Sequence, residues 1–305
     1  MTDEARLARN GFLAGMASYV VWGLLPVYMK LLNGVPATQV VAHRILWSLA
    51  LLAVVLTLAR RWRPFVAAAR QPRMVGALFA SAAFVATNWL IYMWSVQHDR
   101  VIEASLGYFI NPLVSVLLGV IVLRERLRAP QWTALAIAGV GVAVLAIASG
   151  GSLVIPLGLA FSFGLYGLVR KLAPVDALTG LTIETALLAP FALAWLVVAH
   201  RAGEGGFGAS PMVDGLLIFT GPLTAAPLLL FAVAARRLSL STLGVIQYVA
   251  PTLQFFQAVL LFNEALTTVR LICFGCIWVA LAIYAVDGWR ASRQAATKVA
   301  ATEPT

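Results

Sequence analysis

The sequence predicts an all-α membrane protein with ten transmembrane helices. Hydrophobic residues make up 61% of the 305 residues and charged residues only 11%, whereas soluble domains carry roughly 25% charged residues. The apolar residues form runs of the ~20 residues that a membrane-spanning helix needs. A chain with so few charges cannot cover a water-exposed surface, so lipid is its expected surroundings.

Ten apolar runs fit this length. The first is expected to be a retained span and not a signal peptide, because it is longer than a typical signal core of roughly 7–15 residues. Residues 1–11 are expected to form a short cytoplasmic N-terminus and 287–305 a disordered cytoplasmic tail. A tight turn at 150–152 should separate the fifth and sixth spans. The spans are expected at 12–32, 37–59, 74–96, 100–123, 131–149, 153–172, 177–199, 212–235, 240–262 and 268–286.

The basic residues between these spans predict the topology. Of the 22 lysines and arginines, seventeen fall on the side that holds both termini, four fall on the other side, and Arg44 lies inside a span. Cytoplasmic loops are enriched in Lys and Arg. Both termini are therefore expected to face the cytoplasm, in a bacterial inner membrane.

The two halves of the chain repeat each other. A proline in span four, Pro112, is followed thirteen residues later by Glu125, and Pro251 in span nine is followed at the same distance by Glu264. The segment that begins at Trp22 aligns with one in span six. A unit of five spans is odd, so the second unit (153–286) enters the membrane inverted relative to the first (12–149). Inverted repeats are typical of secondary transporters, which alternate between two faces.

The two prolines predict where a binding site lies. A mid-helix proline frees the carbonyl four residues earlier, and in lipid that carbonyl must meet protein or water. We therefore expect both helices to kink beside a midplane cavity. The alternative is that neighbouring polar side chains only satisfy the freed carbonyls. The candidate cavity residues are Tyr108, Asn111, Gln247 and Tyr248, with Trp22, Asn88 and Trp89 as wall residues that could equally be packing residues.

Ionisable residues inside a membrane are costly and mark functional sites by default. Arg44 and Glu184 hold equivalent positions in the two repeats, but depth counted from opposite faces puts them roughly 10 Å apart. Each is therefore expected to have its own partner: Glu103, with Lys30 joining or competing, for Arg44, and Lys171 for Glu184.

Other classes of protein are disfavoured. The pair Cys273 and Cys276 has no nearby ligand in the sequence and is interpreted as packing, so no metal or cofactor is expected. No zinc-protease, dinucleotide or Walker motif is present, and the basic residues follow topology rather than a nucleic-acid patch. A membrane-embedded enzyme or a non-transporting sensor or accessory subunit remains the alternative. The expected partners are the lipid bilayer and an unidentified small molecule, with a homodimer left open.

Several stretches resemble the drug/metabolite transporter superfamily, EamA type, and within it the RarD group of bacterial permeases. They cover roughly 12–286, and the stretch from Glu103 to Pro112 is the most specific. They are Trp22-Gly-Leu-Leu-Pro, Ala42-His-Arg44, Asn88-Trp89-Leu, Glu103-Ala-Ser-Leu-Gly-Tyr-Phe-Ile-Asn-Pro112, Leu159-Ala-Phe-Ser-Phe-Gly164, Ile183-Glu184-Thr, Leu240-Ser-Thr-Leu-Gly244 with Gln247-Tyr248, and Ile277-Trp-Val-Ala-Leu-Ala-Ile283.

The resemblance implies a bacterial inner-membrane permease, not an enzyme, with a central cavity. The group carries a label of chloramphenicol sensitivity or resistance, and its transported compound is poorly defined. We therefore expect a secondary transporter without ATP that moves a small organic solute or drug. Export and coupling to protons are the expectations for direction and driving force.

Overall fold

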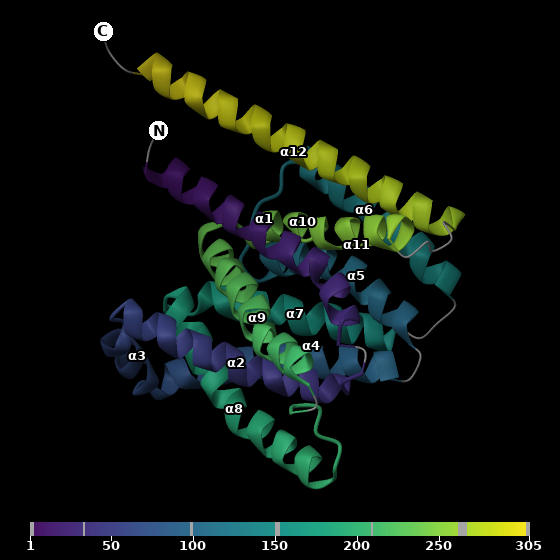
Figure 1. Cartoon of the computed structure of the whole chain (residues 1–305). Coiled ribbons are helices and arrows are strands. Elements are labelled where there is room, and N and C mark those ends of the chain that lie inside the picture. The colour runs from purple at the N-terminus through teal and green to yellow at the C-terminus, as the bar shows by residue number, and fades with distance from the viewer. Residues whose placement is uncertain are drawn as a thin grey trace.

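The computed structural model describes residues 3–32, 34–97, 100–149, 153–208, 210–261 and 267–302, and the regular structure in these ranges is entirely helical (Figure 1). The predicted turn at 150–152 and Glu264 lie outside the described residues. The helices are α1 (Asp3–Lys30), α2 (Ala37–Leu58), α3 (Trp62–Ala69), α4 (Pro72–Gln97), α5 (Val101–Ile121), α6 (Ala129–Ser149), α7 (Val154–Leu172), α8 (Ala177–Arg201), α9 (Pro211–Arg237), α10 (Leu240–Ile246), α11 (Val249–Leu260) and α12 (Thr268–Thr302).

In the described part of the chain, eight helices are long and apolar enough to cross a membrane, and α5 adds a shorter apolar stretch, Leu106–Ile121. The eight are α1, α2, α4, α6, α7, α8, α9 and α12. The ninth predicted span differs from expectation because it consists of two short helices, α10 and α11. The chain is thus a multi-pass membrane protein, and its contact with the lipid bilayer follows from these helices.

Pro251 explains the break between α10 and α11. Its ring nitrogen has no hydrogen to give to the Gln247 carbonyl one turn earlier, and that carbonyl instead accepts from the N–H of Ala250 at 3.2 Å. The predicted kink in the ninth span is therefore present at Gln247–Tyr248. The equivalent Pro112 lies inside α5, which continues through it as one helix.

Two further elements differ from the sequence interpretation. The link at 60–73 contains a short helix, α3, with Phe65 and Ala68 turned toward the protein. Helix α12 extends to Thr302, through much of the segment from 287 that was expected to be disordered. Alanine is frequent in that segment, and alanine has the highest helix propensity.

Side-chain caps account for where several helices begin. Asp176 accepts from the N–H of Thr179 at the start of α8, and Ser210 accepts from Val213 at the start of α9. Asp and Ser are preferred at this position because they satisfy N–H groups that lack a partner within the helix. Helix α10 is held from outside as well, because Glu125 accepts from the N–H groups of Leu240 at 2.6 Å and Ser241 at 2.9 Å.

The helices pack around two main cores. The larger lies among α1, α7, α9 and α10 and contains Tyr19, Tyr166 and Phe231. The second lies among α5, α6, α11 and α12 and contains Phe109 and Phe274. The contacts join α5 with α7, α6 with α12, α1 and α2 with α9, α2 with α8, α4 with α7 and α8, α10 with α5, and α11 with α1.

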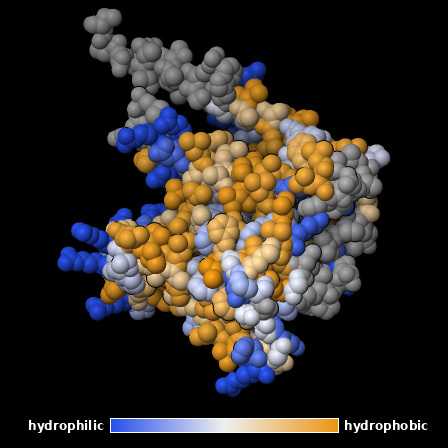
Figure 2. All heavy atoms as spheres, in the orientation of Figure 1, coloured by the Kyte–Doolittle hydropathy of each residue, from blue (hydrophilic) through white to orange (hydrophobic). Residues whose placement is uncertain are grey.

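The surface agrees with a lipid environment. Large hydrophobic side chains are exposed along α1, α2, α6, α8, α9 and α12, among them Ile147 at 82% and Phe191 at 70%. Figure 2 shows broad hydrophobic surface between hydrophilic groups at the left edge and at the lower tip of the molecule. The first turn of α1 and the last turn of α12 lie toward the same side of the view (Figure 1).

The α2–α9 contact depends on Gly221 and provides a test of the packing. A methyl group at Gly221 would lie 2.6 Å from the backbone carbonyl carbon of Trp47. Backbone cannot yield as a flexible side chain does, so Gly221→Ala should lower the free energy of unfolding by about 1–3 kcal/mol. The measurement is thermal unfolding of the purified protein in detergent.

Gly215 provides the matched control on the same helix, because nothing lies within 4 Å of a methyl group placed there. Gly215→Ala should leave stability unchanged or raise it by roughly 0.5–1 kcal/mol, since alanine is the better helix former. Equal effects of the two substitutions would contradict the α2–α9 packing described above.

Candidate functional site

A small cavity lies inside the bundle, where α2, α4, α7, α8 and α9 meet. It encloses about 20 Å³, room for little more than one water molecule. Its lining is mostly apolar, with a few polar groups directed into it. The residues used below are Ser48 of α2, Trp89 of α4, Tyr166 of α7, Glu184 and Thr185 of α8, and Thr224 of α9.

Glu184 forms a buried ion pair on one side of this cavity. Its Oε1 lies 3.4 Å from Nη1 of Arg170, and both side chains are almost fully buried, at 2% and 0% exposure. Nη2 of Arg170 also donates to the carbonyl of Ala177 at 3.3 Å. The guanidinium fits only because position 180 is glycine, where a methyl group would lie 2.1 Å from Nη1.

The partner of Glu184 corrects the sequence interpretation, which assigned Lys171. Lys171 instead donates to the backbone carbonyls of Ala235 and Leu238. Arg170 and Lys171 are neighbours in sequence, but consecutive helical residues point about 100° apart, so only one of them faces α8. Charge and depth in the membrane are nearly the same for these two residues, so only the rotation of α7 about its axis decides which of them reaches Glu184.

Arg44 lies on another side of the same cavity. Its Nε donates to the hydroxyl of Thr224 at 2.8 Å, and its guanidinium carbon lies 5.1 Å from the ring centre of Trp89. Thr224 and Trp89 both line the cavity. A guanidinium over an indole face is a favourable cation–π arrangement, so among the described residues Arg44 is held by a hydroxyl and an indole ring.

The predicted Arg44–Glu103 pair does not form: among the described residues, Glu103 pairs with Arg100 at 3.5 Å. Arg100 is three residues earlier, on the same helical face, and it reaches the carboxylate locally. Lys30 ends α1, and its participation in an outer charge cluster stays a prediction.

Two polar atoms of this cavity lack a hydrogen-bond partner. They are the hydroxyl of Tyr166 and Oε2 of Glu184, both buried. Nε of Arg170 is unpartnered as well, and the hydroxyl of Ser81 lies beside the Glu184 carboxylate. Buried polar groups are nearly always hydrogen-bonded, and exceptions call for an explanation. Their concentration at one cavity makes it the strongest candidate binding site among the described residues.

Of the predicted wall residues, Trp89 lines the cavity and the other two lie elsewhere. Asn88 joins α4 to α7, donating to the carbonyl of Leu159 at 2.9 Å and to Ser162. Trp22 packs edge-on against Tyr19 and Phe163, with ring centres 5.4 and 5.6 Å apart. Both have the packing role that was the alternative interpretation for such residues.

Gln247 and Tyr248, which precede Pro251, join the break between α10 and α11 to α5. Gln247 donates to Ser115 at 3.1 Å, and the hydroxyl of Tyr248 donates to the carbonyl of Phe109 at 3.3 Å. Asn111 is buried with its Oδ1 unpartnered. Tyr108 packs against Tyr92. Tyr248 and Pro112 line a second cavity that is distinct from the one around Glu184.

Sequence reasoning missed several residues of the site, although the spacing of polar residues along two helices could have identified them. Tyr166 and Arg170 are four residues apart on α7 and so share a face. Thr220 and Thr224 repeat at the same spacing on the otherwise apolar α9. The equal four-residue spacing of polar side chains on two apolar helices would have identified these faces as lining a polar interior.

The cysteines pack, as interpreted. Cys273 is fully buried in the second core, and a methyl group at Gly141 of α6 would lie 2.7 Å from the Cβ of Cys276. Small residues thus allow α6 and α12 to approach closely.

The structure is that of an all-helical, multi-pass membrane protein with a small cavity inside its bundle, and its relatives give the class of protein. Residues 9–147 match the EamA-like transporter family. The chain is 43% identical over 296 residues to an uncharacterized transporter of Vibrio cholerae, covering 97% of this chain and 98% of that protein. It is also 43% identical over 285 residues to the protein RarD of Escherichia coli, covering 93% and 96%.

The chain belongs to the EamA-like transporter family, which confirms the predicted family, and its relatives include RarD proteins. A chloramphenicol-sensitive protein RarD of Pseudomonas aeruginosa is 32% identical over 300 residues, covering 94% of this chain and 96% of that protein. A crystal structure with 20% identity superimposes with a TM-score of 0.70 over 92% of this chain and 98% of the other, which shows a shared fold.

The Arg170–Glu184 pair gives a test of the site. Removing one partner of a buried pair typically lowers stability by about 3–5 kcal/mol, because the other charge stays buried. Arg170→Met and Glu184→Leu should each destabilise strongly, and the double variant should be markedly more stable than the sum of the two predicts. The measurement is thermal unfolding in detergent, analysed as a double-mutant cycle.

The control is Arg100→Gln, which removes one partner of the more exposed Arg100–Glu103 pair, where the Arg100 side chain is 47% exposed. Exposed pairs contribute only about 0–1 kcal/mol, so this variant should unfold near the unmodified protein. Additive effects of the Arg170 and Glu184 substitutions would show that the two charges do not interact.

Proposed function

We propose that this protein is a secondary transporter, without ATP and without enzymatic activity, that moves a small organic solute across a bacterial inner membrane by alternating access. The cavity around Glu184 is its substrate and coupling site. Ten spans form two inverted five-helix repeats, 12–149 and 153–286, with both termini cytoplasmic. The observation that carries the proposal is the symmetry of the helix contacts.

Exchanging the halves pairs α1 with α7, α2 with α8, α4 with α9, α5 with α10 and α11, and α6 with α12. Under this exchange, each of three contacts maps onto another observed contact. The α1–α9 contact corresponds to α7–α4, and the α2–α9 contact corresponds to α8–α4. The α5–α7 contact corresponds to the contact of α10 and α11 with α1. The contacts α2–α8, α6–α12 and α5–α10 map onto themselves. A pseudo-two-fold axis requires this pattern, which supports counting α5 as one span and α10 with α11 as another. The contacts of α5 with α6 and of α7 with α9 have no comparable counterpart among the described residues.

The two buried charges follow the same symmetry. Arg44 of α2 bonds to Thr224 of α9, and Glu184 of α8 lies beside Ser81 of α4. Each charge thus approaches the equivalent helix of the other repeat. Two halves of this kind can close at either face with similar energies, which is what alternating access needs.

The cavity is too small for a solute in this conformation. Binding pockets for organic ligands are typically about 300–1,000 Å³, against about 20 Å³ here. The proposed cycle therefore opens the bundle, with the Pro112 and Pro251 regions as hinges. Tyr108, Asn111, Gln247 and Tyr248, which lie within about one helical turn of these prolines in the sequence, are the proposed lining of the opened path.

Glu184 is the proposed proton carrier, and outward transport is the proposed direction. A carboxylate can take up a proton where it is buried and loosely paired, and Oε2 of Glu184 is unpartnered. Protonation weakens the attraction to Arg170, so a proton on Glu184 favours separation of α7 and α8. Chloramphenicol is the first solute to test, because a relative carries it in its name.

The first test concerns topology. A reporter active only in the cytoplasm, fused after residue 287, should give signal, and the same reporter inserted in the loop between α8 and α9 should not. The basic residues on the side of the termini give the physical reason. Signal from the loop insertion instead would overturn the orientation and the inverted repeat with it.

The second test measures flux in sealed proteoliposomes with labelled chloramphenicol under an imposed pH gradient. Glu184→Gln should abolish the response to the gradient. Trp89→Leu and Thr224→Val should reduce flux roughly tenfold or more, because each removes a contact that holds the buried charge Arg44. Trp195→Leu is the matched control, since Trp195 is 46% exposed on α8.

A library of small solutes, tested by thermal shift, extends the search if chloramphenicol does not move, because a ligand that binds the folded state raises its apparent stability. Flux that occurs without a gradient and is unchanged in Glu184→Gln would remove the coupling role. Conversion of an added compound by protein in detergent, without any vesicle, would favour the enzyme alternative.

A further inference from the structure

We propose that α3, with the arginines around it, is a membrane-surface helix that binds the headgroups of anionic phospholipids. Helix α3 joins the end of α2 to the start of α4, and both of these helices are long and apolar enough to cross a membrane. It therefore lies where the bilayer meets water, whichever leaflet that end of the molecule faces. The proposal depends on the membrane location of the chain and not on the proposed transport activity.

The chain turns sharply where α2 ends. Arg60 has a φ of 53°, its N–H donates to the carbonyl of Thr57 at 3.0 Å, and the N–H of Arg61 donates to that of Leu56 at 2.9 Å. A left-handed residue with these two bonds is the Schellman motif, which closes the end of a helix. The chain thus leaves the direction of α2 at the membrane surface, and α3 begins directly afterwards.

One side of α3 packs on the bundle. Phe65 and Ala68 lie against a cluster that contains Met74 and Leu78 of α4 and Ile183 of α8. Helix α3 contacts these same two helices along its length. The packing fixes the rotation of α3 about its axis and therefore determines which side chains face outward.

The outward surface of α3 has an apolar side and a basic side. Trp62 and Val66 share one side, and Arg63 and Arg70 lie roughly 70° further around the axis, at 100° per helical residue. Trp62 is 44% exposed and Val66 40%, and both arginines are exposed. Helices that lie in a membrane interface have this division, with the apolar side toward the acyl chains and the basic side toward the headgroups.

Trp62 has the position of an interfacial tryptophan. Its indole N–H donates to the hydroxyl of Thr57 at 3.0 Å, which holds the ring beside the end of α2. The last residue of α2, Leu58, is 79% exposed. Tryptophan is enriched where membranes meet water, so the apolar side of α3 continues the lipid-facing surface of α2.

The charge of this segment is strongly positive. Residues 59–73 include five arginines and no acidic residue. In the described part of the chain, none of the ion pairs involves these arginines, and the acid near them, Asp176, interacts with Arg61 and caps α8. The five arginines, all of which are exposed, are Arg60, Arg61, Arg63, Arg70 and Arg73.

Phospholipid headgroups are the partner that fits this combination. A guanidinium can grip a phosphate with two N–H bonds, and clusters of basic residues at the ends of membrane helices recognise anionic lipids. A zwitterionic headgroup adds a cation that the arginines repel, so an anionic lipid is favoured over a zwitterionic one.

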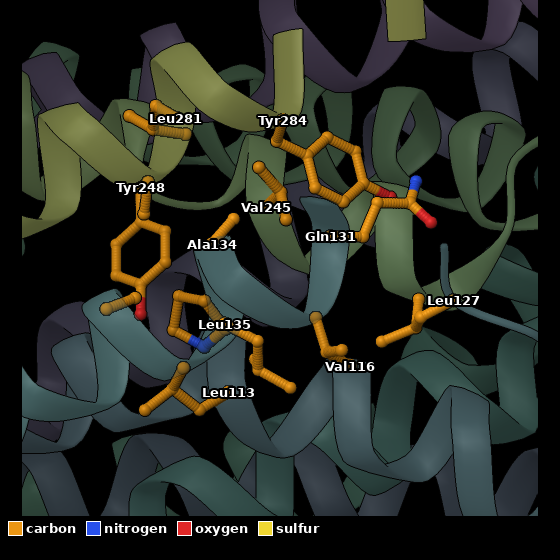
Figure 3. A pocket seen from close by; sticks show the side chains of 13 residues that line it. Leu113, Val116, Leu127, Gln131, Ala134, Leu135, Val245, Tyr248, Leu281 and Tyr284 are labelled. Atoms are coloured by element: carbon orange, nitrogen blue, oxygen red, sulfur yellow. The ribbon is translucent and has the colours of Figure 1, made fainter. Parts of the chain in front are cut away.

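The surface is separate from both cavities. Figure 1 shows α3 at the left edge of the bundle, and Figure 2, in the same orientation, shows hydrophilic groups that project from that edge next to hydrophobic surface. The second cavity lies among α5, α6, α10 and α12 (Figure 3), whereas α3 packs on α4 and α8. No residue of α3 lines the cavity around Glu184.

The first test is native mass spectrometry of the purified protein in detergent, titrated with palmitoyl-oleoyl phosphatidylglycerol or the matching phosphatidylcholine. We expect the phosphatidylglycerol to bind more tightly. Arg63→Gln with Arg70→Gln should weaken its binding roughly twentyfold, since each basic residue near an anionic headgroup contributes about fivefold. The matched control, Arg100→Gln with Arg201→Gln, removes the same charge from exposed positions at the far ends of α4 and α8 and should leave binding nearly unchanged.

The second test measures how α3 lies on the bilayer. A fluorophore is attached at Val66→Cys or, as the matched control, at Ala67→Cys, which is exposed on the side of the arginines. Both variants carry Cys273→Ala and Cys276→Ala, so that the label has one site. In vesicles of phosphatidylglycerol with brominated acyl chains, the label at position 66 should be quenched more strongly, because that side faces the acyl chains. Circular dichroism and elution volume identify any variant that does not fold.

Three outcomes would overturn the proposal: equal binding of the two phospholipids, equal effects of the α3 and control variants, or equal quenching at positions 66 and 67. The lipid result is independent of the flux measurements. A protein that binds phosphatidylglycerol on α3 and transports nothing would keep this inference and lose the proposed function, and the reverse result would do the opposite.

Discussion

Lipid cannot form hydrogen bonds, and this constraint governs the rest of the structure. Every polar group within the bundle must find a partner in the protein. Most do so by joining helices distant in sequence: Ser18 of α1 donates to the carbonyl of Pro227 of α9, Asn88 of α4 to that of Leu159 of α7, and Gln257 of α11 to that of Gly23 of α1. These bonds also fix the orientation of each helix about its axis, because one polar side chain must face one carbonyl.

Against this background, the groups without partners are informative. Tyr166 and Glu184, which both line one small cavity, each have an unpartnered polar atom, and Arg170, the partner of Glu184, keeps an unpartnered Nε. Apolar side chains of the same volume would often make the protein as stable as such an ion pair does, or more stable. The retention of two buried charges at a cavity therefore indicates a use other than stability, and movement of a solute or proton is the use that a transporter fold supplies.

Sequence predicted well the eight described helices that are long and apolar enough to cross a membrane, because length and hydropathy determine them directly, and it predicted the family from the stretch between Glu103 and Pro112. It predicted the partners of the buried charges poorly. Depth along a helix follows from counting residues, but the direction of a side chain around the axis depends on tertiary packing. For this reason Glu184 pairs with Arg170 and not Lys171, and Arg44 bonds to Thr224 and not to Glu103. The α10–α11 break was foreseeable from Pro251, and the α3 helix was not.

The same two prolines lead to different backbones, and packing explains why. Pro251 interrupts the ninth span, whereas α5 continues through Pro112. Around Pro112 the neighbouring α10 approaches very closely, since a methyl group at Gly244 would lie 2.8 Å from the Pro112 carbonyl. The side chains of Gln247 and Tyr248, at the break, bond back to α5. Pro112 thus lies in a continuous helix, and Pro251 lies in a broken span that fits against it. In the proposed pair of inverted repeats, the two proline-bearing spans therefore have unequal conformations at one time.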